Sequence, residues 1–318
     1  MSEWKKLATI PDALPRELRG YDALCDSTDR PRWLAMRRSG IGASEAAVLV
    51  GEHSRLTLAR LVIEKRGMLG DDDATTEFLE WGLRLEPVII EAYSSARYAG
   101  RAAQRAGRLL RSIEHPWALA TLDGWTLHPE HGWIPLELKS TDWARDAWEY
   151  GTPPDYWWQA QHQALVTGAP MVSVACMLGP HKLVWEDVPR DEAAIRRLLV
   201  RGPEVMRLIA SGDDPPGPYD RDTFRALWPT DDGSAIELDE RFIRLDEERE
   251  ELIAARKRAD ARIEEISAEI LAEMRQAQTA IVPNGRTTYS LKTVSRKAYA
   301  VAATTYRQLR RIEKKESA

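Results

Sequence analysis

Two stretches decide the fold, residues 118–125 (ALATLDGW) and residues 133–139 (WIPLELK). Both are apolar runs of β-forming residues, and a turn-like segment, HPEHG, lies between them at residues 128–132. We expect a hairpin with Asp123 near the end of its first strand. Glu137 and Lys139 share one face of the second strand, because strand residues two apart point the same way.

This arrangement predicts a metal site. An acid and a lysine on one face, beside another acid, are costly to bury without a task. Carboxylates that lie close together repel each other, a divalent cation relieves that repulsion, and oxygen ligands select Mg²⁺ or Mn²⁺. A lysine beside the metal can hold or polarise a water, as in metal-assisted phosphodiester hydrolysis. The alternative is an ordinary ion pair between Glu137 and Lys139, since Glu-x-Lys is a common tripeptide.

Helical and β-like patterns alternate around the hairpin. Helical patterns cover residues 44–50, 56–65, 76–95, 154–167 and 191–211, and β-like runs cover residues 109–113, 118–126, 133–139, 172–178 and 181–188. Strands that alternate with helices in this way predict an α/β domain with a central mixed sheet flanked by helices.

A domain boundary is expected near residue 230. The chain has 318 residues, and its 12 tryptophans all lie at or before Trp228. Gly, Pro and Asp are frequent at residues 211–218 and 229–233, which is typical of a linker or exposed loop. We therefore predict a first domain over residues 1–228 and an extension over residues 229–318.

The extension is expected to hold a long helix and a small β-α unit. Residues 237–278 form an amphipathic pattern of coiled-coil character, which indicates either self-pairing or a helix folded back on its own domain. Two β-like runs, 287–294 and 298–302, and a short basic helix from Thr304 follow. Residues 286–318 hold 9 basic against 2 acidic side chains, which fits either a solvated end or a contact with nucleic acid or an acidic partner.

Composition alone argues against nucleic acid. Lys and Arg total 45 and Asp and Glu total 50, a net charge of −5. The two cysteines are too few for an all-cysteine zinc site and favour a reducing cytoplasm. No apolar run is long enough to predict a membrane span. Local charge matters more than the total, because the predicted metal site itself contributes acidic groups.

Three further motifs accompany the hairpin, namely residues 33–45 (WLAMRRSGIGASE), 81–87 (WGLRLEP) and 156–163 (YWWQAQHQ). With the hairpin they make four blocks in order, and together they resemble the YqaJ-type viral recombinase and phage lambda exonuclease family. That family belongs to the PD-(D/E)XK nuclease superfamily. The resemblance covers roughly residues 30–190 and implies a restriction-endonuclease-like α/β core.

The resemblance also implies roles at the metal site. Asp123 and Glu137 would be the metal ligands, helped by the main-chain carbonyl of Leu138, and Lys139 would position the attacking water. Glu86 would lie at the metal site from its helix, as a ligand or as the group that orients the nucleophile. Gln159 would face the same pocket and hydrogen-bond to water or to Lys139. The implied cofactor is Mg²⁺, as two ions, with Mn²⁺ as a substitute.

Arg37 and Ser44 would grip the 5′ phosphate of a DNA end in this family. A bidentate guanidinium and a hydroxyl at a helix start do form a good anion site. The family often has Ser-Pro before the metal-binding Asp, where this chain has Thr121 and Leu122. The Thr121 hydroxyl can still reach the phosphate.

The implied function is a Mg²⁺-dependent 5′-to-3′ exonuclease on linear double-stranded DNA. Such an enzyme releases 5′-mononucleotides and leaves 3′ single-stranded overhangs for single-strand-annealing recombination. By the same resemblance it would be encoded by a phage or prophage and act in the bacterial cytoplasm. It would form a homo-oligomeric ring, often a trimer, and work with an annealing protein. The alternatives are a PD-(D/E)XK endonuclease of restriction or repair type and a non-catalytic DNA-binding or annealing protein.

Some tempting residues have plainer interpretations. His128 and His131 suggest zinc, but no further ligand is near, so a polar loop is the better interpretation. Trp157 and Trp158 could stack on bases, yet tryptophans on an apolar helix usually lie in the core. The arginines of the acid-free stretch 101–111 recur at helix-like spacing, which fits either a solvated face or a patch that follows a nucleic-acid backbone.

Overall fold

The computed structural model describes residues 20–69, 77–98, 103–142, 144–283 and 287–294. The chain divides into two compact units, Met1–Pro229 and Thr230–Ala318. The division lies at the composition change near residue 230, whereas the functional assignment of each part stays a prediction. Arg101, the run 298–302 and the helix expected from Thr304 lie outside the described residues.

A five-stranded mixed sheet is the centre of the first unit. Its strands in spatial order are β3 (Ala103–Arg105), β6 (Gly124–His128), β7 (Gly132–Thr141), β8 (Met171–Leu178) and β9 (Lys182–Pro189). Strands β7 and β8 are parallel, and the other neighbours are antiparallel. Strand β8 is buried over most of its length and β7 over its middle residues, as expected for a sheet covered on both faces.

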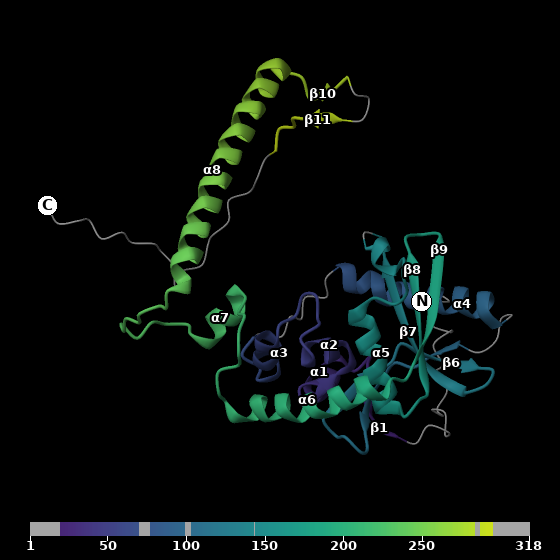
Figure 1. Ribbon diagram of the computed structural model, residues 1–318. Coiled ribbons are helices and arrows are strands. Elements are labelled where there is room, and N and C mark those ends of the chain that lie inside the picture. The colour runs from purple at the N-terminus through teal and green to yellow at the C-terminus, as the bar shows by residue number, and fades with distance from the viewer. Residues whose placement is uncertain (1–19, 70–76, 99–102, 143, 284–286, 295–318) are drawn as a thin grey trace. The chain divides into compact units, whose positions relative to one another are not determined.

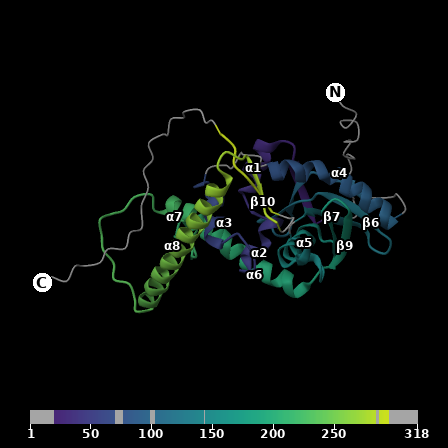
Figure 2. The ribbon, with the colours of Figure 1, turned by 90° about the horizontal axis from the view of Figure 1, so that it is seen from above.

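Helices cover both faces of this sheet. The helix α5 (Pro154–Thr167) connects the parallel strands β7 and β8 and contacts both, while α4 (Glu77–Tyr98) contacts β7, β8 and β9 from the opposite face (Figures 1 and 2). On the α5 face, Ala160 and Ala164 pack with the valines of β8. On the α4 face, Ile89 and Tyr93 pack with Leu136 and Leu138 of β7. The expectation of a mixed sheet flanked by helices is confirmed.

A second sheet of four strands lies in the same unit. Its order is β1 (Tyr21–Asp26), β4 (Arg108–Ser112), β5 (Ala118–Thr121) and β2 (Ile41–Gly42), and only the β2–β5 pair is parallel. The helix α1 (Arg30–Arg37) follows β1, and the short helices η2 (Ala43–Glu45) and α2 (Ala46–Leu49) follow β2. The strands therefore form two sheets where one central sheet was expected.

The reason is a break in the first strand of the predicted hairpin. The apolar run 118–126 is not one strand, because β5 ends at Thr121 and β6 starts at Gly124. At the break the carbonyls of Leu122 and Asp123 accept hydrogen bonds from the chain that links β3 to β4, at 3.2 and 3.0 Å. One side of the break pairs with β4 and the other with β3, so the two halves join different sheets.

The pairing of β3 and β4 with these two strands corrects the interpretation of the arginines in residues 101–111. In the described part, residues 103–105 and 108–112 are strands β3 and β4, so these arginines do not lie along a helix. Arg105 forms an ion pair with Glu86, and Arg111 pairs with Asp22. Because both arginines have acidic neighbours, they form no unopposed patch of positive charge.

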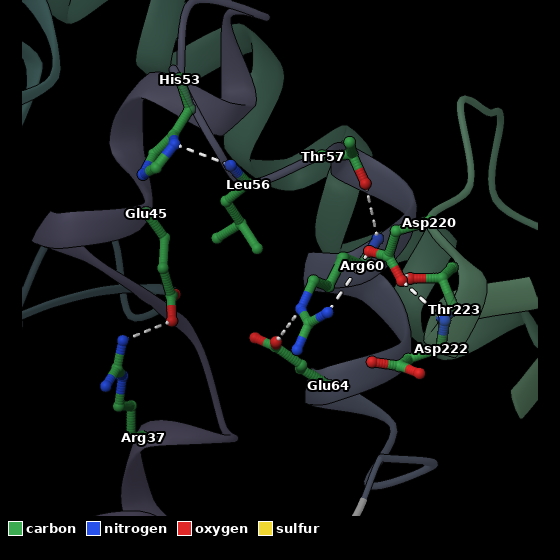
Figure 3. A network of polar contacts seen from close by, with 10 residues as sticks. All are labelled: Arg37, Glu45, His53, Leu56, Thr57, Arg60, Glu64, Asp220, Asp222 and Thr223. Carbon is green, nitrogen blue, oxygen red and sulfur yellow. Dashed lines mark hydrogen bonds and ion pairs between the residues drawn. The ribbon is translucent and has the colours of Figure 1, made fainter. Parts of the chain in front are cut away.

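Three more helices complete the first unit, namely α3 (Leu58–Lys65), α6 (Glu192–Ser211) and α7 (Arg221–Leu227). A polar network ties α3 to the start of α7, because Arg60 pairs with Glu64 at 2.9 Å and with Asp220 at 3.4 Å (Figure 3). Asp220 also caps α7 through the backbone N–H of Thr223. Arg66 donates to carbonyls at the end of α6. These bonds fasten the Pro-rich stretch 211–218 at both ends.

The second unit contains a long helix and a hairpin. The helix α8 (Arg241–Met274) is shorter than the predicted range at both ends, and the strands β10 (Thr279–Ile281) and β11 (Thr288–Ser290) pair antiparallel. Only Met274 of α8 is buried within the described residues, and its leucines and isoleucines are largely exposed. No helix of the described ranges has both the length and the apolar character that crossing a bilayer requires.

His162 of α5 packs against Trp117, the residue before β5. Its ring is fully buried, edge-on to the Trp117 indole with 5.8 Å between ring centroids. The indole rests on Gly202 of α6, where a Cβ would overlap the ring. Neither ring nitrogen of His162 has a hydrogen-bond partner within the described residues. Burial lowers the pKa of His162 to about 4, although the charge of Glu45 acts in the opposite direction.

His162 should make the first unit sensitive to acid. Between pH 6.5 and 4 the unfolded chain takes up a proton that the folded chain excludes, so stability falls by about 1.4 kcal/mol per pH unit. We expect His162→Leu to flatten this slope. Urea unfolding followed by tryptophan fluorescence measures it, because all 12 tryptophans precede residue 229.

The exposed His181 provides the matched control. His181→Gln should keep the parent slope of the free energy of unfolding against pH. Equal slopes in the His162→Leu and His181→Gln proteins would contradict the assignment.

Candidate active site

Glu137 is a buried carboxylate on β7, and its residue is 2% exposed. Its Oε1 accepts from Lys139 Nζ at 2.5 Å and from Gln159 Nε2 at 2.6 Å, while Oε2 accepts from Gln163 Nε2 at 2.5 Å. A buried carboxylate needs such donors, because an unpaired one is strongly destabilising. One strand and one helix together fix this group.

Gln159 and Gln163 supply the helical part of this arrangement. Gln159 hydrogen-bonds to Glu137, whereas a bond to water or to Lys139 was expected. No role was expected for Gln163. Its signal was present in the sequence, because residues four apart on a helix share one face. The Gln163 Oε1 has no partner among the described residues, so Glu137 is what orients this amide.

Asp123 lies at the break between β5 and β6, beside Leu138 of β7. Its Oδ2 accepts from the backbone N–H of Leu138 at 2.8 Å. Burial raises the pKa of Asp123 well above its ordinary value, and the negative charges of Glu137 and Glu86 raise it further. Two acids that disfavour each other's charge mark a place where a cation would be stabilising.

Lys139 stays protonated in this environment. Burial alone would lower its pKa, but Glu137 and Asp123 raise it above the ordinary value of lysine. The ammonium also lies 4.8 Å from the centroid of the Tyr156 ring, in cation–π geometry. Lys139 is therefore a donor of hydrogen bonds and not a base.

Glu86 approaches from α4, the helix on the other face of the sheet. It forms an ion pair with Arg105 of β3 at 2.9 Å. Burial raises the pKa of Glu86, against the effect of Arg105, and Glu137 raises it further. Glu86 is thus close enough to feel the charge of Glu137, while its direct contact is an arginine.

The donor set fits a hard divalent cation. Asp123, Glu137 and Glu86 offer carboxylate oxygens, and Lys139 and Arg105 are the basic groups beside them. Oxygen-only donors with an excess of negative charge suit Mg²⁺ or Mn²⁺. In the described ranges no three His, Cys, Asp or Glu side chains lie close enough to form a metal site by themselves. Asp123 and Glu137, whose charges act most strongly on each other, are the candidate ligands with the main-chain carbonyl of Leu138.

A second polar centre surrounds Arg37 at the end of α1. Its Nη2 donates to Ser44 Oγ at 3.3 Å and to Glu45 Oε1 at 2.9 Å. The guanidinium lies 5.1 Å from the centroid of the Trp33 ring. Ser44 is exposed, and Arg37 is partly exposed, so an anion has access to both.

Trp33 connects this centre to the break in the strand. Its indole N–H donates to the Thr121 hydroxyl at 2.9 Å. Thr121 ends β5, two residues before Asp123. The three residues predicted to bind phosphate are therefore joined in one series of contacts that ends beside the candidate metal ligands.

The other tempting residues have structural roles. His128 and His131 stack with 4.8 Å between ring centroids at the tip of the β6–β7 hairpin. The indole of Trp158 is buried and donates to Glu52 at 2.7 Å, with Arg197 over its ring. The core interpretation therefore holds for Trp158.

Comparison with known proteins gives a consistent result. Residues 32–170 match the YqaJ-like viral recombinase domain, which confirms the resemblance predicted from the motifs. The uncharacterized protein YqaJ of Bacillus subtilis (strain 168) is 28% identical over 170 residues, which are 52% of this chain and 52% of that protein. The chain thus spans about half the length of this curated relative.

Solved structures of exonucleases are also similar to the chain. An alkaline exonuclease from Laribacter hongkongensis, LHK-Exo, shares 18% identity over 57% of this chain and 93% of its own, with a TM-score of 0.46. Its complex with dAMP gives 19% identity, the same coverage and a TM-score of 0.47. A phage-related exonuclease from Haemophilus somnus 129PT shares 15% identity over 55% of this chain and 96% of its own, with a TM-score of 0.40.

The repulsion at the carboxylate pair predicts a stability gain without metal. Asp123→Asn removes one buried charge and keeps an acceptor for the Leu138 N–H. We expect the free energy of unfolding in EDTA to rise by about 1–3 kcal/mol. Added Mg²⁺ should stabilise the parent protein and have little effect on the variant.

Urea unfolding with and without Mg²⁺ makes both measurements. The exposed Asp214 supplies the control, and Asp214→Asn should behave as the parent does in both conditions. A lower stability of Asp123→Asn in EDTA would show that the two carboxylates do not repel each other.

Proposed function

We propose that this chain, whose residues 32–170 match the YqaJ-like viral recombinase domain, is a Mg²⁺-dependent exonuclease of linear double-stranded DNA with a PD-(D/E)XK core. It would degrade the 5′-ended strand, release 5′-mononucleotides and leave 3′ single-stranded overhangs. The observation that carries this proposal is the pairing of two centres. The Asp123–Glu137–Lys139 group begins two residues after Thr121, which Trp33 contacts, and the Arg37–Ser44 pair, which an anion can reach, lies on the other side of Trp33.

Asp123, Glu137 and the main-chain carbonyl of Leu138 would hold the metal, with Glu86 as a further ligand or as the group that orients the nucleophile. Mn²⁺ would substitute for Mg²⁺, and two ions are proposed. When bound, the metal polarises the scissile phosphate and favours ionisation of a water. Gln159 and Gln163 keep the Glu137 carboxylate in one orientation through their amide donors.

Lys139 acts through its charge and its N–H donors. Because it remains protonated, it holds the attacking water and the developing negative charge on phosphate without removing a proton. Its ammonium is oriented by Glu137 and by the Tyr156 ring. Replacement by a neutral residue should remove this stabilisation from the transition state.

Arg37, Ser44 and Thr121 would bind the 5′ phosphate of the strand to be degraded. Arg37 and Ser44 are mutually oriented by the 3.3 Å hydrogen bond, and Thr121 is placed by Trp33. A pocket that requires a terminal phosphate favours ends over internal sites. This is the basis for an exonuclease over the endonuclease alternative.

The wider setting is proposed from the domain match. We infer a role in single-strand-annealing recombination of a phage or prophage in a bacterial cytoplasm, with a homo-oligomeric ring, such as a trimer, and an annealing protein as partner. The extension at residues 229–318 would then serve assembly, partner docking or DNA contact.

A time course on linear duplex labelled separately at each end tests reaction, polarity and metal together. We expect loss of the 5′ label as mononucleotide in Mg²⁺, no digestion in EDTA, and resistance of closed circular duplex. Lys139→Ala and Glu137→Ala should each slow digestion by about a hundredfold or more.

Lys182→Ala is the control, because this lysine is exposed on β9 and should leave the rate unchanged. Rapid nicking of a closed circle would support the endonuclease alternative. Unaltered digestion by Lys139→Ala and Glu137→Ala would contradict the catalytic assignment and favour a non-catalytic DNA-binding protein.

A further inference from the structure

A buried ion pair lies directly behind Arg37. Glu45 of η2 and Lys65, the last residue of α3, meet with 2.7 Å between Oε2 and Nζ. Their side chains are 6% and 4% exposed. Neither residue belongs to the Asp123–Glu137 centre, and neither has a role in the function proposed above.

The pair connects three elements around the Arg37 backbone and side chain. The Lys65 ammonium also donates to the Arg37 carbonyl at 2.8 Å, at the end of α1. Glu45 accepts from the backbone N–H of Gly42 through Oε2, at 2.7 Å. Through Oε1 it accepts from Arg37 (Figure 3). Lys65 therefore holds the Arg37 main chain, and Glu45 holds the Arg37 guanidinium.

Stability alone does not explain why these positions carry charges. A buried ion pair is often no more stabilising than well-packed apolar residues of the same volume. Burial raises the pKa of Glu45, but Arg37 and Lys65 together lower it below its ordinary value, so the carboxylate is ionised. A permanent negative charge is thus held next to the arginine proposed to bind an anion.

That charge has two opposite effects on Arg37. As a hydrogen-bond acceptor it fixes one edge of the guanidinium, while the Trp33 ring lies against it. As a charge it cancels the attraction of Arg37 for phosphate, because the two groups sum to zero. Adding Lys65 restores a net charge of +1 for the group, and Lys65 is too buried to contact DNA itself.

We propose that Glu45 and Lys65 are positioning residues that set the preference for a 5′-phosphorylated end. Glu45 orients Arg37, and Lys65 neutralises Glu45, so that Arg37 presents a fixed geometry and an uncancelled charge to the terminal phosphate. The inference rests on the proposed function, because that function assigns the terminal phosphate to Arg37.

The test compares one duplex carrying either a 5′ phosphate or a 5′ hydroxyl, and the readout is the ratio of the two initial rates. Lys65→Met leaves the Glu45 charge opposed to Arg37 alone, and we expect the ratio to fall about tenfold. Lys65→Arg keeps the charge and should keep the ratio. The double variant Lys65→Met with Glu45→Gln removes both charges and should recover most of it.

A loss of folding or of catalysis lowers both rates and leaves the ratio unchanged, so the ratio isolates end recognition. If Lys65→Met does not fold, Glu45→Asp serves instead. It keeps all charges but is one methylene shorter, so it cannot hold Arg37 and the Gly42 N–H together. We expect a lower ratio for this variant as well.

A binding measurement separates this inference from the proposed function. Fluorescence anisotropy with the Glu137→Ala protein in EDTA gives the affinity ratio for the same two duplexes without catalysis. If Lys65→Met and Glu45→Asp leave this affinity ratio at the parent value, the inference is overturned and the proposed nuclease activity is unaffected. Equal binding of both duplexes by the parent site also overturns it. The protein could also fail to digest DNA in Mg²⁺ and still bind the phosphorylated duplex more tightly. If Lys65→Met abolishes that preference, the nuclease proposal is overturned and the inference is supported.

Discussion

The buried carboxylate of Glu137 is the constraint on which the site depends. A charge in that position requires donors, and they come from Lys139 on the same strand and from two amides of α5. The helix can supply them because it connects the parallel strands β7 and β8 and lies against both. The crossover that closes the sheet therefore also completes the candidate metal centre. The hydrogen bonds that the buried Glu137 carboxylate requires therefore link the sheet topology to the candidate site.

The first unit holds two clusters of charged side chains, and their net charges have opposite signs. Around Glu137 and Asp123 the acids outnumber the bases, and the excess negative charge favours a bound cation. Around Arg37 the bases outnumber the acid by one, which leaves room for an anion. The strand break at Leu122 and Asp123 brings the clusters together, because the residue before the break contacts Trp33.

Much of this could be predicted from local patterns. The bounds of α5 and α6 follow, to within a residue, from the helical patterns at residues 154–167 and 191–211, and the Glu137–Lys139 face follows from strand periodicity. The division into two sheets could not be predicted, since an apolar run does not reveal which neighbour each half pairs with. The Glu45–Lys65 pair was missed for a similar reason. Twenty residues separate its members, and nothing local marks a lysine as buried.

The two units also differ in how strongly salt affects the interactions that stabilise them. The first is held by apolar contacts across two sheets, which ions hardly weaken. The helix α8 buries almost nothing among the described residues, so it depends on side-chain pairs along its own surface, such as Arg256 with Asp260 and Arg262 with Glu265. Ionic strength screens exposed pairs of this kind. The stability of the helix beyond residue 240 should therefore depend more on ionic strength than that of the two sheets.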